Sequence, residues 1–177
     1  MRFPDGHRLE TLRRGRPRRP FHSGESAVDD WLKTKALQHQ QKHLSTTKIL
    51  LDSAGTIAGY YTLATGQVDF GDLPAEITRK LPRRALPVAL LAWLGVNADR
   101  QGQGLGQLLL AQALRDCYEA GQTFAFVAVI LDCVSDAAKT FYQRWDFEEL
   151  PGHPYRLFLS AGRLAAMMES GKRGGTP

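Results

Sequence analysis

LGVNADRQGQGLGQLLL, residues 94–110, decides the fold, because it joins an apolar strand to an amphipathic helix through a turn with almost no side chains. Gly102, Gly104 and Gly106 let the backbone of this turn come close to a ligand. The free N–H groups at the start of the helix and the positive end of its dipole then point at one anion. The stretch therefore predicts a phosphate cradle, with a pyrophosphate as the anion.

Two other glycine-rich nucleotide sites do not match this turn. A Walker loop needs a Lys-Ser/Thr pair after its second Gly, whereas Gly106 is followed by Gln107 and Leu108. A dinucleotide fingerprint reads G-x-G-x-x-G and belongs to a fold with a second βαβ repeat, and this sequence has neither. What remains is Gln101-x-x-Gly104-x-Gly106 at the start of a helix that directly follows an apolar strand.

The segments on both sides of the turn carry strand and helix patterns. Val88–Leu94 is a continuous apolar run, typical of a strand buried on both faces. Thr123–Leu131 is predicted as a second fully apolar strand, which follows the helix as a crossover connection would. Between them, apolar residues recur at helical spacing at Leu105, Leu108, Leu109, Ala113, Leu114 and Cys117. The sequence therefore predicts two parallel strands at the centre of a sheet.

The other expected elements complete an α/β domain. Residues 24–43 are predicted as a helix, capped by Ser23 or Ser26, with an apolar face at Val28, Trp31, Leu32, Ala36 and Leu37. Strands over 46–51 and 57–65 read as a hairpin. A short helix or loop over 71–81, a helix over 135–145 and a last strand over 155–159 follow. The prediction is a mixed central sheet with parallel central strands, flanked by helices.

Length and composition limit the class of protein. The 177 residues and their 43% hydrophobic content suit one compact domain. No apolar run approaches the roughly 20 residues of a membrane helix, and residues 1–6 lack the apolar core of a signal peptide. A cytoplasmic protein without membrane contact is expected. Cys117 and Cys133 have no metal-ligand spacing and are predicted as small packed residues, with catalysis by Cys133 as the alternative.

The basic residues are concentrated in clusters. The formal net charge is +5. Arginines crowd residues 8–19, further cations occur at Lys33, Lys35, Lys42 and Lys48, and another group comprises Arg79, Lys80, Arg83 and Arg84. Such clusters can neutralise phosphates and steer a nucleic acid to the protein. The alternative is a solvated face with a disordered N-terminal arm, and the sequence leaves both open.

Gln101-x-x-Gly104-x-Gly106 resembles the acetyl-CoA pyrophosphate loop of the GNAT acetyltransferases. A second match lies within residues 137–147, where Ala-x-x-Phe-Tyr-x-x-Trp-Asp-Phe is similar to the Ala-x-x-Phe-Tyr-x-x-x-Gly-Phe element of that family. Asp146 replaces the usual Gly, and Asp adopts a left-handed backbone less readily than Gly does. Phe141 and Tyr142 are retained.

The resemblance narrows to the GNAT toxins of bacterial type II toxin–antitoxin pairs and covers about residues 21–159. Four segments match in the same order as in those toxins: 21–32, the helix end at 36–40, the strand at 59–64, and Leu81-Pro82 with Pro87-Val88. One departure is Trp93-Leu94-Gly95-Val96-Asn97, which stands where the toxins usually read Arg-Leu-Ala-Val-Asp. Charge and composition add a basic arm (1–20) before the GNAT-like domain (21–168) and a disordered tail (169–177) after it.

The resemblance implies transfer of an acetyl group from acetyl-CoA to the α-amino group of an aminoacyl-tRNA, which blocks translation. It assigns cofactor contacts to Leu94, Val96, Gln101, Gly102, Gly104, Leu105, Gly106, Gln107 and Phe141, without a metal. Tyr142 is the catalytic candidate, as proton donor to the leaving thiolate. An α-amine has a pKa of about 7.7 to 8, so a dedicated general base is dispensable. Arg79, Lys80, Arg83 and Arg84 are the RNA-binding candidates.

The implied partners are aminoacyl-tRNA, a ribbon-helix-helix antitoxin and a second copy of the chain. Two other functions remain open from the sequence. A GNAT enzyme for a small-molecule amine or a protein N-terminus would keep the cofactor site and would not need the basic clusters. A module that only binds a partner, such as a corepressor, would not need Tyr142.

Overall fold

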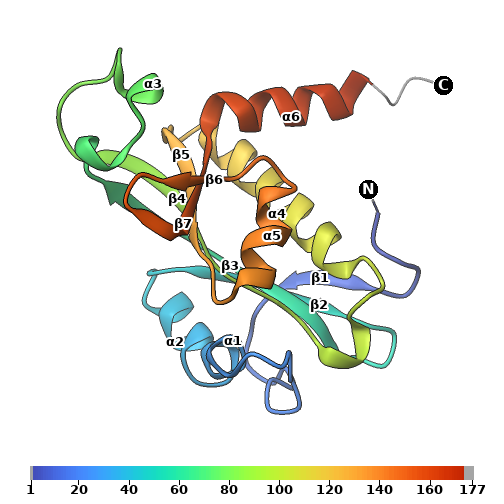
Figure 1. Ribbon diagram of the computed structural model, residues 1–177. Helices are drawn as coiled ribbons and strands as arrows, with labels where there is room; N and C mark the ends of the chain where they lie inside the picture. The colour runs from blue at the N-terminus through green and yellow to red at the C-terminus, as the bar shows by residue number, and fades with distance from the viewer. Residues whose placement is uncertain (1, 174–177) are drawn as a thin grey trace. The chain divides into compact units, whose positions relative to one another are not determined.

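The computed structural model describes residues 2–173. Within them, the strands form one mixed sheet in the order β1-β2-β3-β4-β5-β7-β6 (Figure 1). Their bounds are β1 (Arg8–Thr11), β2 (Thr46–Leu51), β3 (Ile57–Val68), β4 (Leu86–Val96), β5 (Ala128–Asp132), β6 (Glu148–Leu150) and β7 (His153–Ser160). Strands β4 and β5 are parallel, with Val88 opposite Ala128 and Leu90 opposite Ile130. The predicted α/β fold and its parallel central pair are confirmed.

The helices are α1 (Ser26–Asp30), α2 (Ala36–Gln41), α3 (Ala75–Thr78), α4 (Leu105–Gly121), α5 (Asp136–Gln143) and α6 (Ala161–Arg173). A π-helical turn over Trp31–Lys35 joins α1 to α2, and 3-10 turns cover Phe70–Asp72 and Ala98–Arg100. The predicted helix over 24–43 is therefore one continuous helical segment with a π turn inside it. Glu25 is its N-cap, without a side-chain cap hydrogen bond. Neither Ser23 nor Ser26 has the capping role expected from the sequence.

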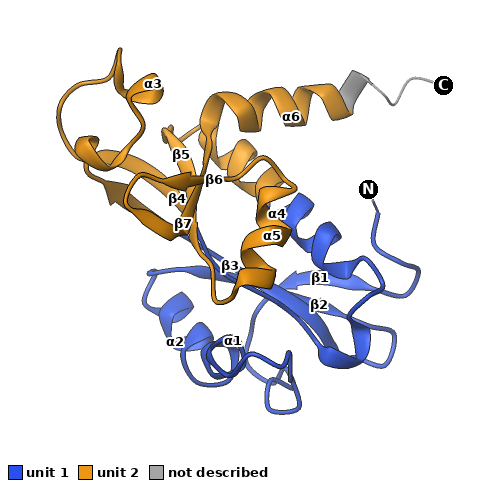
Figure 2. Ribbon diagram, viewed as in Figure 1, with its two compact units in different colours: residues 1–64, 91–113 blue, residues 65–90, 114–177 orange. Residues whose placement is uncertain are grey.

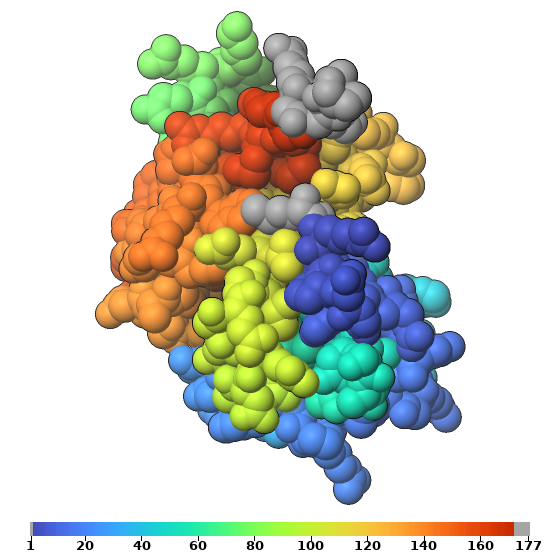
Figure 3. Space-filling view, turned by 90° about the vertical axis from the view of Figure 1, so that its right-hand side faces the viewer, coloured from blue at the N-terminus to red at the C-terminus, as the bar shows by residue number. Residues whose placement is uncertain are grey.

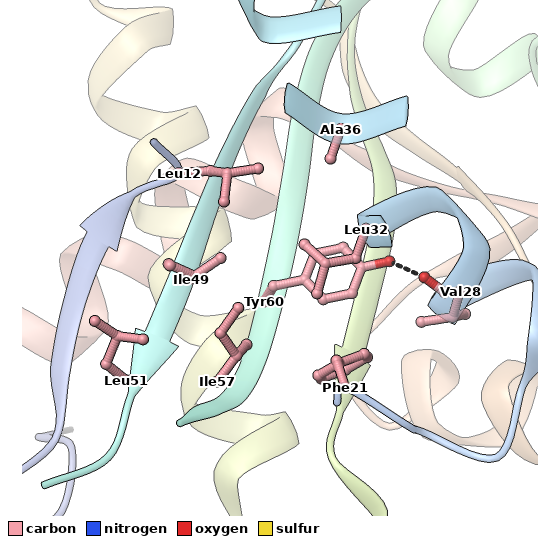
Figure 4. Packing of buried hydrophobic residues seen from close by; sticks show 9 residues of the cluster. All are labelled: Leu12, Phe21, Val28, Leu32, Ala36, Ile49, Leu51, Ile57 and Tyr60. Atoms are coloured by element: carbon pink, nitrogen blue, oxygen red, sulfur yellow. Dashed lines mark hydrogen bonds between the residues drawn. The ribbon is translucent and has the colours of Figure 1, made fainter. Parts of the chain in front are cut away.

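The chain divides into two compact units (Figure 2): residues 1–64 with 91–113, and residues 65–90 with 114–177. In the first unit, α1 and α2 pack on strands β1–β3 around a core of fully buried side chains (Figure 4). Tyr60 lies in this core and donates a hydrogen bond of 2.5 Å from its hydroxyl to the carbonyl oxygen of Val28. Fully burying one large apolar side chain contributes about 1.5–3 kcal/mol, so this core fixes α1 on the sheet.

Strands β2 and β3 form the expected hairpin, with Ile49 opposite Tyr60. Gly95 of β4 lies against α1 in the same unit. A Cβ added to Gly95 would come within 2.5 Å of Val28 Cγ1. A residue without a side chain therefore allows this close packing of helix on strand.

The second unit has its own core. It contains Val68, Leu73, Leu86, Val88, Ala128, Ile130, Leu150 and Phe158. Strand β7 pairs antiparallel with β5, with Ile130 opposite Phe158, and β6 pairs antiparallel with β7. Helix α6 follows β7 directly and buries Leu164.

Three expectations about the apolar strands and the chain's first residues are corrected. Strand β4 is not buried on both faces throughout, since Ala92 is exposed and Leu90, Trp93 and Leu94 are half-buried. Strand β5 begins at Ala128 rather than Thr123, because the N–H groups of Thr123 and Phe124 both bond the carbonyl oxygen of Ala120 at the end of α4. Within the predicted arm, residues 8–11 belong to the sheet, because β1 pairs with β2 from Arg8–Leu51 to Thr11–Lys48.

The predicted disordered tail is also corrected in part. Helix α6 runs to Arg173, so residues 169–173 are helical. The rest of that prediction, residues 174–177, lies outside the described residues.

Candidate functional site

The glycine-rich turn lies between β4 and α4, at the surface of the first unit. In Figure 3 the yellow-green segment around residue 100 lies beside the teal turn between β2 and β3. Gly102 and Gly104 have left-handed backbones, with φ of 74° and 80°. A Cβ at either position would meet nothing within 4 Å. The turn therefore offers exposed backbone to a ligand, as the sequence predicts.

The start of α4 presents N–H groups to the same space. The first hydrogen bond of the helix runs from Leu108 N to Gly104 O, at 3.2 Å. Leu105, Gly106 and Gln107 therefore have no acceptor one turn earlier inside the helix. These N–H groups and the positive end of the helix dipole favour an anion at this position.

The turn is tied to two distant segments of its unit. Arg100 Nη2 lies 2.8 Å from Asp52 Oδ2, in an ion pair with the β2–β3 turn. Gln101 Nε2 donates to Ser23 O at 2.7 Å and to Val96 O at 3.1 Å. The backbone N–H of Ala98 donates to His22 O at 2.7 Å. These bonds fix the path of the loop before any ligand arrives.

Gln101 has a structural role in the loop that the sequence did not predict. Its side chain bonds two carbonyl oxygens, and its own N–H bonds Ala98 O at 3.3 Å. The phosphate contact expected of Gln101 stays a prediction, whereas the glycines and the first turn of α4 offer donors directly. Leu94 and Val96, the expected contacts for the rest of the ligand, are half-buried near the end of β4.

Asn97 and Trp93 each make contacts of their own. The side chain of Asn97 caps the 3-10 turn that leads into the loop, because its Oδ1 accepts a hydrogen bond from Asp99 N. The backbone N–H of Asn97 donates to Ala58 O at 2.8 Å. The Trp93 ring stacks on Trp31, with 5.4 Å between ring centroids and 17° between planes. Trp31 Nε1 also donates to Thr62 Oγ1, a buried hydroxyl.

Tyr142 lies in the second unit, on α5. Ser135 caps this helix by accepting a hydrogen bond from Ala138 N at 3.1 Å. The Tyr142 ring is buried between Phe141 and Phe147, with centroid distances of 5.1 and 5.8 Å. Burial raises the pKa of the Tyr142 phenol above its ordinary value of 10, and the nearby Cys133 adds to the rise. The phenol is therefore protonated at neutral pH and can act as a donor.

Asp146 follows α5 with a left-handed backbone, φ 63°. The turn thus has the conformation for which Gly is usual, and Asp is one of the residues that tolerate it. Phe147 is consequently placed against the Tyr142 ring. The replacement of Gly by Asp leaves this part of the site intact.

The cysteines are packed as expected. Cys117 is buried in α4, and burial raises the pKa of its thiol to about 12. Cys133 is half-buried after β5, and its pKa is also raised, first by burial. A raised pKa disfavours the nucleophilic thiolate, which argues against catalysis by Cys133.

The four basic candidates of the second unit lie around α3. Arg79, Lys80, Arg83 and Arg84 are all exposed. The Arg83 guanidinium sits over the Phe70 ring, 5.8 Å from its centroid. Among residues 2–173, no group of three or more His, Cys, Asp or Glu side chains is placed to hold a metal ion. No helix in the same range has the length and apolar character to cross a membrane.

Comparison with protein families identifies the chain. The model of the acetyltransferase (GNAT) domain matches residues 48–149, which include the loop, α4 and α5. The chain belongs to the GNAT acetyltransferase family.

Two curated relatives and one solved structure resemble this acetyltransferase over most of its length. The tRNA-acetylating toxin of Mycobacterium tuberculosis is 35% identical over 139 residues, which cover 78% of this chain and 82% of the relative. The probable toxin TacT of Sinorhizobium fredii is 26% identical over 160 residues, which cover 85% and 88%. AtaT complexed with acetyl-methionyl-tRNAfMet superposes with a TM-score of 0.84 at 23% identity, covering 92% of this chain and 99% of AtaT.

The loop of this acetyltransferase fits the diphosphate of a CoA thioester. Such a group needs several N–H donors and room for its oxygens close to the backbone. The first turn of α4 supplies the donors, and the open space at Gly102 and Gly104 supplies the room.

Proposed function

We propose that this acetyltransferase transfers an acetyl group from acetyl-CoA to the α-amino group of an aminoacyl-tRNA and blocks translation as the toxin of a toxin–antitoxin pair. The observation that carries the proposal is the 35% identity to a tRNA-acetylating toxin over 78% of the chain. An acetylated α-amine can no longer form a peptide bond. The proposal is also supported by two solved structures that share the fold of this chain, AtaTR bound with acetyl-CoA and an AtaT mutant toxin bound to the C-terminus of the antitoxin AtaR.

In this proposal the first unit binds the cofactor. Acetyl-CoA, when bound, supplies the acetyl group as a reactive thioester. The N–H groups of Gly102, Gly104 and the first turn of α4 hold the diphosphate oxygens, and Arg100 keeps the loop in place through Asp52. Leu94 and Val96 are the proposed contacts for the arm that leads to the thioester, and Phe141 stays a predicted cofactor contact.

Tyr142 holds the proton for the leaving sulfur. The acceptor amine forms the new C–N bond, the C–S bond breaks, and the phenol donates to the sulfur as negative charge develops there. The raised pKa of the Tyr142 phenol supports its role as proton donor, because a phenol with a pKa above 10 stays protonated at neutral pH. The acceptor needs no strong base, since an α-amine with a pKa of about 7.7 to 8 is partly deprotonated at pH 7.

The proposal also covers the residues that bind the tRNA and the protein partners. Arg79, Lys80, Arg83 and Arg84 contact RNA phosphates, which their common exposure around α3 supports. The protein acts in the cytoplasm as a homodimer and is inhibited by a ribbon-helix-helix antitoxin.

The decisive experiment measures transfer of radiolabelled acetyl from acetyl-CoA to total charged tRNA. We expect label with charged tRNA and none with uncharged tRNA. Tyr142→Phe should bind acetyl-CoA normally and lose about 10²- to 10⁴-fold in turnover, the usual range for a lost proton donor. Tyr118→Phe removes a phenol oxygen from α4 and serves as the matched control, with wild-type turnover.

Two results would contradict the proposal. Wild-type protein that binds acetyl-CoA but labels no charged tRNA would indicate a small-molecule or protein acceptor. Full turnover in Tyr142→Phe would remove Tyr142 from the mechanism and leave the acceptor assignment standing.

A further inference from the structure

The first twenty residues carry an unusual share of the charge. They contain seven arginines against two acidic residues, Asp5 and Glu10, a net charge of +5. The whole chain has the same formal net charge of +5. All other charged residues together therefore cancel, and the excess positive charge belongs to this segment.

The segment is fixed to the body of the first unit. β1 pairs with β2 over four residues, and Leu12 after it is buried. Leu12 N donates to Thr47 O at 2.8 Å, and Leu12 O accepts from Gln40 Nε2. Arg18 donates to the carbonyl oxygens of Leu32 and Lys33 in the π turn. The arginines between these anchors are consequently held in place, and binding a ligand does not require ordering a loose arm.

Glu10 organises three of the arginines. Arg16 bonds its carboxylate in a bidentate pair, and Arg8 Nε and Arg13 Nε lie 3.3 and 3.4 Å from it. Glu10 is 17% exposed, whereas the Arg8 and Arg13 side chains are each 67% exposed. One half-buried carboxylate thus gathers three guanidinium groups and leaves two positive charges uncompensated. Arg14 and Arg19 on the same segment are also exposed.

We propose that this arginine surface, defined as Arg8, Arg13, Arg14, Arg16 and Arg19, binds the phosphate backbone of the tRNA substrate. The inference rests on the proposed function and adds a second RNA contact, in the first unit, to the basic group around α3. Guanidinium groups are the usual partners of backbone phosphates, and such contacts position a nucleic acid without reading its sequence.

The chemistry of the surface favours RNA over a protein partner. Hot spots of protein interfaces are enriched in Trp, Tyr and Arg, and residues 2–20 contain neither Trp nor Tyr. The large exposed hydrophobic side chains of the described chain are Leu44, Phe124, Val134 and Tyr155, and all of them lie outside residues 2–20. In Figure 3 the dark blue start of the chain and the yellow-green loop occupy the same face of the first unit.

The test is a steady-state comparison of Arg13→Gln/Arg14→Gln with wild-type protein. Both residues are exposed, and the anchors Arg16 and Arg18 are kept. The control is Arg115→Glu, which alters the net charge by the same two units at an exposed position of α4. KM and kcat for aminoacyl-tRNA, and KM for acetyl-CoA, are measured over a range of KCl concentrations.

We expect the double variant to raise KM for aminoacyl-tRNA about tenfold at low salt, with kcat and KM for acetyl-CoA unchanged. The slope of log(1/KM) against log[KCl] should fall by about two, roughly one for each lost phosphate contact. Arg115→Glu should leave the slope as in the wild type. If a melting curve shows that the double variant is unfolded, Arg14→Gln alone should lower the slope by about one.

Any of the following results would overturn the inference. Unchanged KM for aminoacyl-tRNA, with active wild-type protein, would reject the arginine surface and leave the proposed function standing. A rise in KM for acetyl-CoA alone would assign the arginines to the phosphates of the cofactor. If wild-type protein acetylates no tRNA, the proposed function fails, and equal binding of uncharged tRNA by both proteins would then reject the surface independently.

Discussion

Arg100 and Asp52 are 48 positions apart in the chain, and their ion pair holds the anion-binding loop against the β2–β3 turn. Burial by itself would raise the pKa of the Asp52 carboxyl. The N–H groups of Thr56 and Ala54 and the Arg100 guanidinium outweigh burial, so the pKa lies below its ordinary value of 3.8. The carboxylate therefore stays charged to a lower pH than an ordinary Asp does, and Arg100 keeps its charged partner over that range.

Asp52→Asn tests this ion pair. The amide keeps the shape of the side chain and loses the charge, so the loop is held less firmly, and we expect KM for acetyl-CoA to rise several-fold while kcat stays nearly constant. We also expect a loss of about 1–2 kcal/mol in unfolding free energy at pH 7. Because the folded-state pKa is lowered, this contribution is complete above about pH 4 and disappears as pH falls through the folded value.

Urea unfolding at pH 7 and at pH 3 measures the effect. The difference between wild type and Asp52→Asn should shrink at the lower pH. Asp99→Asn, an exposed carboxylate in the same loop, is the matched control and should behave as wild type at both values. A difference that is as large at pH 3 as at pH 7 would mean that packing, and not charge, makes Asp52 important.

At the scale of elements, the anion site is made by one strand, one turn and one helix that follow each other in the chain. Gly104→Glu places bulk and negative charge where the N–H groups of α4 point. We expect acetyl-CoA binding to be lost by calorimetry, with circular dichroism unchanged. Gly152→Glu is the matched control, because Gly152 also has a left-handed backbone (φ 77°) and no atom within 4 Å of an added Cβ. If both variants bind acetyl-CoA as the wild type does, the loop assignment is wrong.

The elements that the sequence predicts correctly are those with a strong local pattern. The β2–β3 hairpin and the helix around Tyr142 are examples, since alternation, turn residues and the Ser135 cap all lie within a few positions. β1 was missed because Arg8–Thr11 is short and charged, and it becomes a strand only by pairing with β2, about 40 residues away. Residues 123–127 have strand-like composition, but their N–H groups are partly used to end α4.

The same distinction holds for the candidate site. The loop glycines and Tyr142 are visible in the sequence because their spacing is characteristic. Asp52 is not, because a carboxylate in a turn has no pattern that connects it to a loop 48 residues later. An Asp at the start of the Asp52–Gly55 turn indicates only that its side chain bonds nearby N–H groups, as it does with Ala54 and Thr56.

For the molecule as a whole, the reaction depends on the protonation of both the substrate and the enzyme. The acceptor α-amine must be neutral, and its pKa is about 7.7 to 8. The Tyr142 phenol must be protonated, and burial places its pKa above 10. We therefore expect kcat/KM for aminoacyl-tRNA to rise about tenfold per pH unit below pH 7 and to level off near pH 8. It should show no falling limb up to about pH 9.5.

Single-turnover acetylation over pH 5.5–9.5 measures this profile, with times short enough to limit hydrolysis of the aminoacyl ester. Tyr142→Phe should keep the same rising limb at its lower rate, because that limb belongs to the acceptor amine and not to the enzyme. A falling limb near pH 8.5 would require a proton donor other than the buried phenol. A rising limb centred near pH 6.5 would instead indicate a histidine base, and the exposed His22, which Asp29 bonds at 3.1 Å, would be the first residue to replace.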